Sequence, residues 1–240
     1  MNQTKDIMGQ AGMDYLLNPE SNPIIEVWSD IAETEELPVS YFFRKYKEMP
    51  KLEQEALALS NGRILDVGAG LGTHSIYLQD KNRDVVALEL SPLACEVMEK
   101  RGIKNVVNEN FYNHNPSQKY DTILFLMNGL GVAQNIAGFP NFFKKLKELL
   151  APEGKIIFDS SDLKYLFMEE DGSMVIDLNS NYYGEIVYKM NYKEYEGEEF
   201  PWIFIDEDLL SLLAEENGFR FTKLLDGPHY DYMGMLEIIK

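Results

Sequence analysis

The fold of this chain is decided by the stretch Arg63-Ile-Leu-Asp-Val-Gly-Ala-Gly-Leu-Gly-Thr73. Its apolar start is typical of a short, buried parallel strand. Glycines then follow at alternate positions, Gly68, Gly70 and Gly72. The residues after Thr73 have the composition of the first turns of a helix. Strand, glycine turn and helix together predict a nucleotide-binding βαβ unit, because a turn without Cβ atoms lets a ligand approach the backbone.

An acidic residue stands where the ribose of a nucleotide is expected. Glu89 ends the next apolar run, about 20 residues beyond the glycines. A carboxylate at this place can accept hydrogen bonds from both ribose hydroxyls. The glycine spacing differs from the dinucleotide fingerprint G-x-G-x-x-G, because the third glycine comes one residue early and Thr73 takes its place. An NAD-dependent oxidoreductase is therefore the less favoured alternative.

The run Asp66-Val-Gly-Ala-Gly-Leu-Gly72 resembles motif I of the class I S-adenosylmethionine-dependent methyltransferases. Tyr120–Met127 and Leu149–Lys155 are also similar to segments of that family. The resemblance implies an α/β, Rossmann-like fold: a seven-stranded, mostly parallel sheet with helices on both faces and a terminal antiparallel hairpin. It implies S-adenosyl-L-methionine (SAM) as the cofactor. The residues implied to contact the cofactor are Asp66, Gly68, Ala69, Gly70, Gly72, Glu89, Leu90, Asn110, Phe111, Asn128 and Gly129.

Three of these residues are assigned by their place after a strand. Asn110 stands where relatives usually have Asp, and it can still accept a hydrogen bond from the adenine amine. Phe111 is then expected to pack on the adenine face. Asn128 follows the fourth predicted strand, and ligands of open α/β sheets collect beyond the carboxyl ends of the strands. We therefore expect Asn128 to border the reacting methyl group.

The chain is expected to form an N-terminal helical lid segment, 1–62, followed by a methyltransferase domain, 63–240. A helix is predicted over 24–31 from apolar residues at helical spacing. Within the domain, 163–205 is predicted to be an inserted, small antiparallel β cap, with strands at 174–178, 185–192 and 200–205. Asp206 is expected to cap the helix that follows the insertion.

Methyl transfer needs alignment and exclusion of water more than a strong base, because the sulfonium is already an activated leaving group. Among the three histidines, His229 in the final hairpin turn is the favoured base, and a simple surface histidine is the alternative. The acceptor is expected to contact Tyr41 and Arg44 of the lid segment, together with Asp159 and Tyr232. No metal-ligand spacing is present in the sequence.

The amino-acid composition limits the classes of molecule that the protein is expected to bind. The 240 residues include 40 acids and 22 bases, giving a net charge of −18, which repels phosphate backbones and anionic membranes. A small-molecule acceptor is therefore expected, with neither nucleic acid nor membrane as partner. A single cysteine, Cys95, and the lack of an apolar leader predict a cytoplasmic protein. Two matters stay open: the oligomeric state, and a non-catalytic, methyltransferase-like binding protein as a further alternative.

Overall fold

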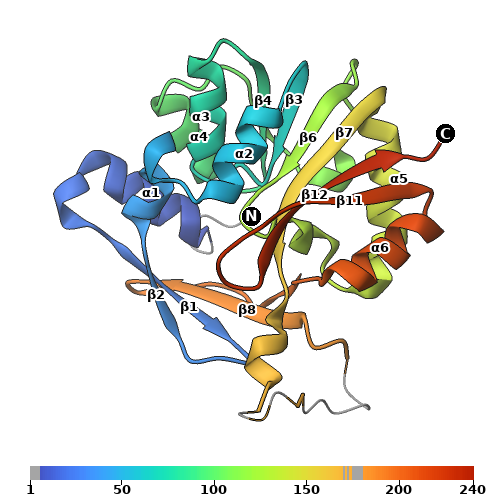
Figure 1. The fold of residues 1–240 in the computed structure, drawn as a ribbon. Coiled ribbons are helices and arrows are strands. Elements are labelled where there is room, and N and C mark those ends of the chain that lie inside the picture. Colours follow the sequence, from blue (N-terminus) through green and yellow to red (C-terminus); the bar gives the residue numbers. More distant parts are fainter. Residues whose placement is uncertain (1–5, 170, 172, 175–180) are drawn as a thin grey trace.

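The computed structural model describes residues 6–169, 171, 173–174 and 181–240, which form two sheets (Figure 1). Seven described strands form the large sheet in the order β11-β12-β7-β6-β3-β4-β5. They are β3 (Arg63–Val67), β4 (Asp84–Glu89), β5 (Val106–Asn108), β6 (Tyr120–Phe125), β7 (Leu150–Ser161), β11 (Phe219–Asp226) and β12 (Asp231–Ile238). The strands β7, β6, β3, β4 and β5 run parallel, and β12 is antiparallel to both β7 and β11. The predicted fold class, including the terminal hairpin, is confirmed.

Helices cover both faces of the large sheet, because successive strand side chains point to opposite sides. The helices are α1 (Ile7–Leu17), α2 (Lys51–Leu59), α3 (Thr73–Asp80), α4 (Pro92–Lys100), α5 (Phe139–Leu149) and α6 (Glu207–Glu216). Ile64 of β3 packs against α2 and α3, and its neighbour Leu65 belongs to the core formed with α5 and α6. Figure 1 shows α2, α3 and α4 on one side and α5 and α6 on the other.

The small sheet combines strands from two parts of the chain that were predicted to form separate units. Its strands are β1 (Ile24–Ser29), β2 (Glu35–Pro38), β8 (Glu185–Tyr192), β9 (Tyr195–Glu196) and β10 (Phe200–Ile203). They are arranged in the order β10-β8-β1-β2, with β9 beside β8. Strands from the first 62 residues and from the insertion therefore share one antiparallel sheet. The predicted strands at 185–192 and 200–205 are confirmed as β8 and β10, whereas the one at 174–178 lies, apart from Met174, outside the described residues.

The predicted helix at 24–31 is wrong, because these residues form β1 and the bend after it. Its apolar residues fit a helical spacing and an alternating one almost equally well, so local pattern did not separate the two. Pairing with distant chain decides the matter: β1 lies between β2 and β8, which satisfy its backbone on both sides. The inward position is occupied by Ile25, which is fully buried.

The small sheet lies across the carboxyl edge of the large sheet, at the end where β7 descends in Figure 1. Trp202 of β10 marks the contact. Its indole Nε1 donates a hydrogen bond of 3.2 Å to the carbonyl of Asn128, just beyond β6. A Cβ atom on Gly131 would lie 2.0 Å from the Trp202 ring, so the indole packs directly against the backbone of Gly131. Among the described residues no helix is long and apolar enough to cross a membrane.

Candidate cofactor and acceptor site

The glycine turn after β3 opens its backbone toward free space. Gly68 and Gly70 have φ of 66° and 55°, in the left-handed region that favours glycine. A Cβ atom built on Gly68 would meet no heavy atom within 4 Å, and one on Gly70 would meet only the Gly68 carbonyl, at 3.9 Å. No described residue fills this space, so the turn has room for a ligand against its backbone.

The Cα of Gly72 faces the other way, toward the hydrophobic core, and its contact with the cofactor stays a prediction. Its φ is 84°, and an added Cβ would lie 2.3 Å from Cδ1 of Ile103 and 2.8 Å from Cγ of Met98. Glycine is required here by the packing of the turn on the hydrophobic core behind it. Ala69 is also buried, and its N–H and that of Gly68 both donate to the carbonyl of Leu88 in β4.

Glu89, at the carboxyl end of β4, is joined directly to the glycine turn. Its Oε2 accepts the N–H of Gly70 at 2.8 Å, and its Oε1 accepts the N–H of Ser91 at 2.9 Å. Burial raises the pKa of Glu89, and these backbone donors partly offset the effect. Each carboxylate oxygen keeps a lone pair for a further donor. Leu90, next in the chain, has a half-exposed side chain beside this carboxylate.

Asp66 lies beneath the turn, and its contact with the cofactor stays a prediction. Its side chain is buried, and its Oδ2 accepts a 2.6 Å hydrogen bond from the hydroxyl of Ser75 in α3. Burial raises the pKa of Asp66, and the hydrogen bond from Ser75 acts against that rise. The carboxylate thereby fastens the first turn of α3 to the end of β3 and supports the glycine turn from below.

The two predicted adenine contacts, which follow β5, differ in their exposure to solvent. Asn110 is exposed, and its Oδ1 accepts the N–H of Tyr112 at 2.9 Å, which leaves its amide nitrogen without a partner among the described residues. Phe111 is 5% exposed, and its ring packs at 5.5 Å from Phe125 and 5.7 Å from Phe142, measured between centroids. The ring therefore belongs to the hydrophobic core, and its packing on adenine stays a prediction.

The turn after β6 is held by a carboxylate from the neighbouring strand. Met127 and Asn128 both have left-handed φ, 59° and 57°. Asp159 of β7 accepts the N–H of Met127 at 2.7 Å and that of Asn128 at 3.0 Å. The hydroxyl of Ser161 donates to Oδ1 of Asn128 at 3.1 Å. The next residue, Gly129, is buried and begins a 3-10 helix.

Burial raises the pKa of Asp159 to about 6, although the two backbone donors act against this rise. The carboxylate carries two hydrogen bonds and retains capacity for another donor. Asp159 therefore stabilises the turn after β6, and its raised pKa lets its protonation state change near pH 6.

Below the glycine turn, the side chains of Arg44, Glu53 and His74 form a buried polar cluster. Arg44 contacts the Glu53 carboxylate at 2.5–2.6 Å, and Nε2 of His74 lies 2.7 Å from the same carboxylate. Burial raises the pKa of Glu53, but His74 and Arg44 outweigh that effect and hold the pKa below its ordinary value. The Tyr41 ring, 37% exposed, lies over the Arg44 guanidinium at 3.9 Å. Of the two predicted lid contacts, only Tyr41 has a substantial exposed surface.

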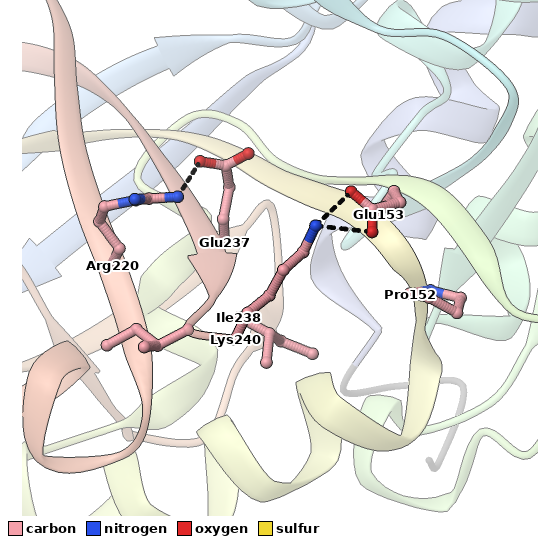
Figure 2. Close-up of a pocket in the computed structure, with 8 residues that line it drawn as sticks. Pro152, Glu153, Arg220, Glu237, Ile238 and Lys240 are labelled. Atoms are coloured by element: carbon pink, nitrogen blue, oxygen red, sulfur yellow. Dashed lines mark hydrogen bonds and ion pairs between the residues drawn. The ribbon is translucent and has the colours of Figure 1, made fainter.

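A cavity of about 530 Å³ opens beside Arg44, between α1, β2 and the 3-10 helix that contains Tyr41. It is lined by Tyr15, Leu37, Pro38, Ser40, Tyr41, Phe43, Arg44 and Glu48. A second hollow, of about 300 Å³, lies at the far end of β7, between the ion pairs Arg220–Glu237 and Lys240–Glu153 (Figure 2). It is remote from the carboxyl edge, and exposed pairs of this kind contribute little binding or stability.

The final hairpin places the two remaining predicted residues apart. Tyr232 is 2% exposed and belongs to the core, where its hydroxyl donates to the Ile205 carbonyl at 2.8 Å. Its contact with the acceptor stays a prediction. His229 is exposed in the turn, where its backbone N–H donates to Asp231 at 2.7 Å. Its role as a base stays a prediction.

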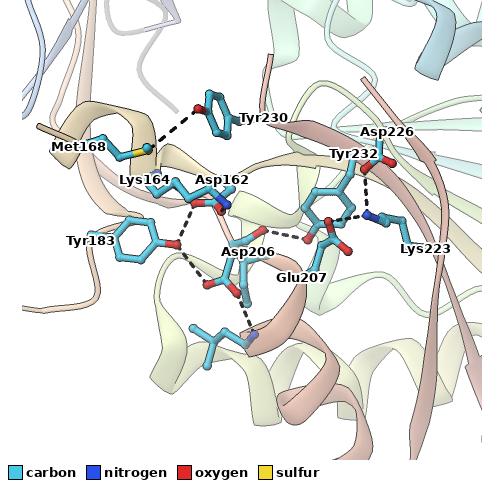
Figure 3. A network of polar contacts seen from close by, with 12 residues as sticks. Asp162, Lys164, Met168, Tyr183, Asp206, Glu207, Lys223, Asp226, Tyr230 and Tyr232 are labelled. Atoms are coloured by element: carbon cyan, nitrogen blue, oxygen red, sulfur yellow. Dashed lines mark hydrogen bonds and ion pairs between the residues drawn. The ribbon is translucent and has the colours of Figure 1, made fainter. Parts of the chain in front are cut away.

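A polar network ties this end of the molecule together. Figure 3 shows the Tyr183 hydroxyl between the carboxylates of Asp162 and Asp206. Asp206 also caps α6, as predicted, by accepting the N–H of Leu209 at 3.0 Å. The Lys164 ammonium pairs with Asp162 at 2.8 Å. The network fastens the insertion to the end of β7 and the start of α6.

This geometry agrees with comparisons to known proteins. A family model described as a methyltransferase domain matches residues 41–224. The structure of a SAM-dependent methyltransferase from Bacteroides fragilis, in complex with S-adenosyl-L-homocysteine, shares 42% identity over 100% of this chain and 98% of its own, with a TM-score of 0.93. The chain belongs to the SAM-dependent methyltransferases. SAM is therefore the cofactor of this methyltransferase, and the NAD-dependent alternative is set aside.

More distant structures share the fold alone. The CcbJ methyltransferase from Streptomyces caelestis is 16% identical over 81% of this chain and 95% of its own, with a TM-score of 0.60. The sugar N-methyltransferase KedS8 from Streptoalloteichus is 13% identical over 83% of this chain and 88% of its own, with a TM-score of 0.54. A search of curated proteins finds no match.

Several residues of the methyltransferase site were not singled out from the sequence. Glu53 and Ser91 are examples, each placed by contacts with residues far along the chain. Ser91 directly precedes Pro92, and a serine before a proline at a helix start is a recognisable cap signal. Glu53, in the first turn of α2, carries no such local signal for its pairing with Arg44 and His74.

Proposed function

We propose that this methyltransferase binds SAM along the glycine turn and transfers its methyl group to a small molecule at the carboxyl edge of the large sheet. One observation carries the proposal: Gly68 and Gly70 face open space, and the Glu89 carboxylate is fixed beside them by the N–H of Gly70. When bound, SAM supplies an activated methyl group. The protein's part is to bind, to align and to exclude water.

Individual residues take distinct parts in this proposal. The Glu89 carboxylate accepts the ribose hydroxyls, and the half-exposed Leu90 and the free amide nitrogen of Asn110 face the adenine. Asn128 borders the reacting group, held in place by Asp159. His229 in the hairpin turn remains the proposed base where an acceptor must lose a proton.

The acceptor side is proposed to include an aromatic residue of the small sheet. Of the tyrosines in the insertion, Tyr182 and Tyr183 bind Asp206, and Tyr192 donates to Asp14 of α1. Tyr188 differs from these three: the residue is half-buried, its hydroxyl has no partner among the described residues, and burial raises its pKa to about 12. A neutral phenol left free in this way suits hydrogen bonding to an organic acceptor.

The net charge of −18 supports a small acceptor over a nucleic acid. The single cysteine, Cys95, is buried and supports a reducing, cytoplasmic setting. The division at residue 62 into a lid and a catalytic domain stays a proposal.

Calorimetry tests the cofactor site directly. S-adenosylhomocysteine should bind wild-type protein with a micromolar constant, about −8 kcal/mol, and NADH far more weakly. Glu89→Ala should lower the affinity at least tenfold, since it removes charge-assisted hydrogen bonds worth about 1.5–3 kcal/mol each. Normal binding by Glu89→Ala would contradict the ribose role. Incubation with a metabolite pool and labelled SAM would then identify the acceptor by its gain of label.

A further inference from the structure

Asp6, the first described residue, caps two helices at once. Its side chain is 3% exposed. Oδ1 accepts the N–H of Gly9 at 3.1 Å, which caps α1. The same oxygen accepts the Ser91 hydroxyl at 2.5 Å, and Oδ2 accepts the N–H of Leu93 at 3.0 Å, at the start of α4. Two helix N-termini therefore share one buried carboxylate, whose charge suits both helix dipoles.

A continuous hydrogen-bonded path leads from this carboxylate to the glycine turn. Ser91 accepts the N–H of Ala94 at 2.9 Å through its hydroxyl, which is oriented by donation to Asp6. The backbone N–H of Ser91 donates to Oε1 of Glu89, and Oε2 of Glu89 accepts the N–H of Gly70. Asp6, Ser91, Glu89 and Gly70 therefore form one connected series.

Close packing supports the same connection. A Cβ on Gly9 of α1 would lie 2.4 Å from Cβ of Leu93, so α1 lies directly against the start of α4. A Cβ on Gly12 would lie 2.5 Å from a methyl carbon of Leu71, which belongs to the glycine turn. Leu71 is 1% exposed and shares a hydrophobic cluster with Ile7 of α1. The N-terminal helix therefore supports the turn from behind, rather than only covering a ligand.

We propose that Asp6 is a positioning residue for cofactor binding: it fixes Ser91, and through Ser91 it holds the Glu89 carboxylate where the ribose is bound. The inference rests on the proposed role of Glu89. It adds that docking of α1 and binding of the cofactor favour one another, because both depend on the same Ser91 geometry. Residues before β3 thus take part in building the cofactor site.

A double-mutant cycle tests this coupling, with S-adenosylhomocysteine as the calorimetric probe. Asp6→Ala should weaken binding about tenfold, and Asp6→Asn, which keeps an acceptor of the same shape, should recover part of the loss. In the double variant Asp6→Ala/Glu89→Ala, the affinity should match that of Glu89→Ala alone to within about threefold, because Asp6 acts through Glu89.

Asp206→Ala is the matched control, since Asp206 caps α6 as Asp6 caps α1, by accepting the N–H of the residue three positions further along the chain. It should lower the unfolding temperature much as Asp6→Ala does and leave the affinity for the probe unchanged. Equal weakening by Asp206→Ala, or fully additive losses in the cycle, would overturn the inference. If Glu89→Ala itself binds normally, the proposed ribose role fails first, and that result is distinct from normal binding by Asp6→Ala alone.

Discussion

The carboxylate of Asp159 accepts the backbone N–H of Asn128 at 3.0 Å. This hydrogen bond stabilises a turn whose left-handed backbone conformation is unfavourable for the residues that form it. Asn128 and the preceding Met127 both have left-handed φ, which costs a non-glycine residue about 1–2 kcal/mol. The contact is possible because β6 and β7 are parallel neighbours, with Phe125 opposite Phe158. A tertiary contact therefore maintains the backbone beside the proposed methyl-transfer position.

Asp159 should make stability depend on pH. Its pKa rises from an ordinary value of 3.8 to about 6 in the folded protein. Between these values the folded state binds more protons than the unfolded state, so this group's contribution to stability falls as pH rises from about 4 to about 6. The change corresponds to about 2–3 kcal/mol.

The measurement is urea unfolding of wild type and Asp159→Asn across this pH range. The difference in unfolding free energy between the two should change with pH in this window and level off above it. At low pH, Asp159→Asn should be less stable by about 1–3 kcal/mol, because its amide cannot accept both backbone donors. A difference that does not vary with pH would contradict the raised pKa.

Two glycines of the same turn should respond in opposite ways to alanine. Gly68→Ala has room for the methyl group and should cost about 1–2 kcal/mol of stability through its left-handed φ. It should nevertheless lose at least tenfold in affinity for S-adenosylhomocysteine, because the methyl group occupies the ligand's space. Gly72→Ala drives its methyl group into Ile103 and should cost about 3 kcal/mol or more. Thermal unfolding and calorimetry on both variants separate the two effects.

The buried contact between Arg44 and Glu53 should be strongly sensitive to truncation. Glu53→Ala leaves the Arg44 guanidinium without its partner, with both side chains 5% exposed, and should cost about 3–5 kcal/mol. Glu96→Ala breaks the exposed pair with Lys100 and should cost about 0.5 kcal/mol or less. Chemical denaturation measures both. Similar small losses would show that Arg44 finds another partner.

The inserted strands should be tested by single substitutions. Removing 174–205 would take away β8, which pairs with β1 as well as β10, and should unfold the small sheet. Tyr188→Phe keeps the ring and removes only the hydroxyl. It should lower methyl transfer to the identified acceptor about tenfold while leaving the affinity for S-adenosylhomocysteine within about twofold. An unchanged transfer rate would assign Tyr188 to packing alone.

The sequence alone determined the parts of this protein that depend on local pattern. The glycine turn, Glu89 at the end of β4 and the terminal hairpin could all be predicted from the sequence. Strand and helix periods, and the need for glycine at left-handed φ, depend on residues that are close together in the chain. The same reasoning predicted the N-cap of α6 at Asp206.

The direction in which individual side chains face, and the pairing of distant strands, depend on tertiary contacts. The residues 24–29 became a strand because β8 and β2 flank them, and Phe111 and Tyr232 joined the core although their positions in the chain suggested ligand contacts. Asp6 reaches Ser91 across 85 positions of sequence. Such contacts depend on the packing of segments that are far apart in the chain, and the local hydrophobic pattern does not indicate which segment will be the partner.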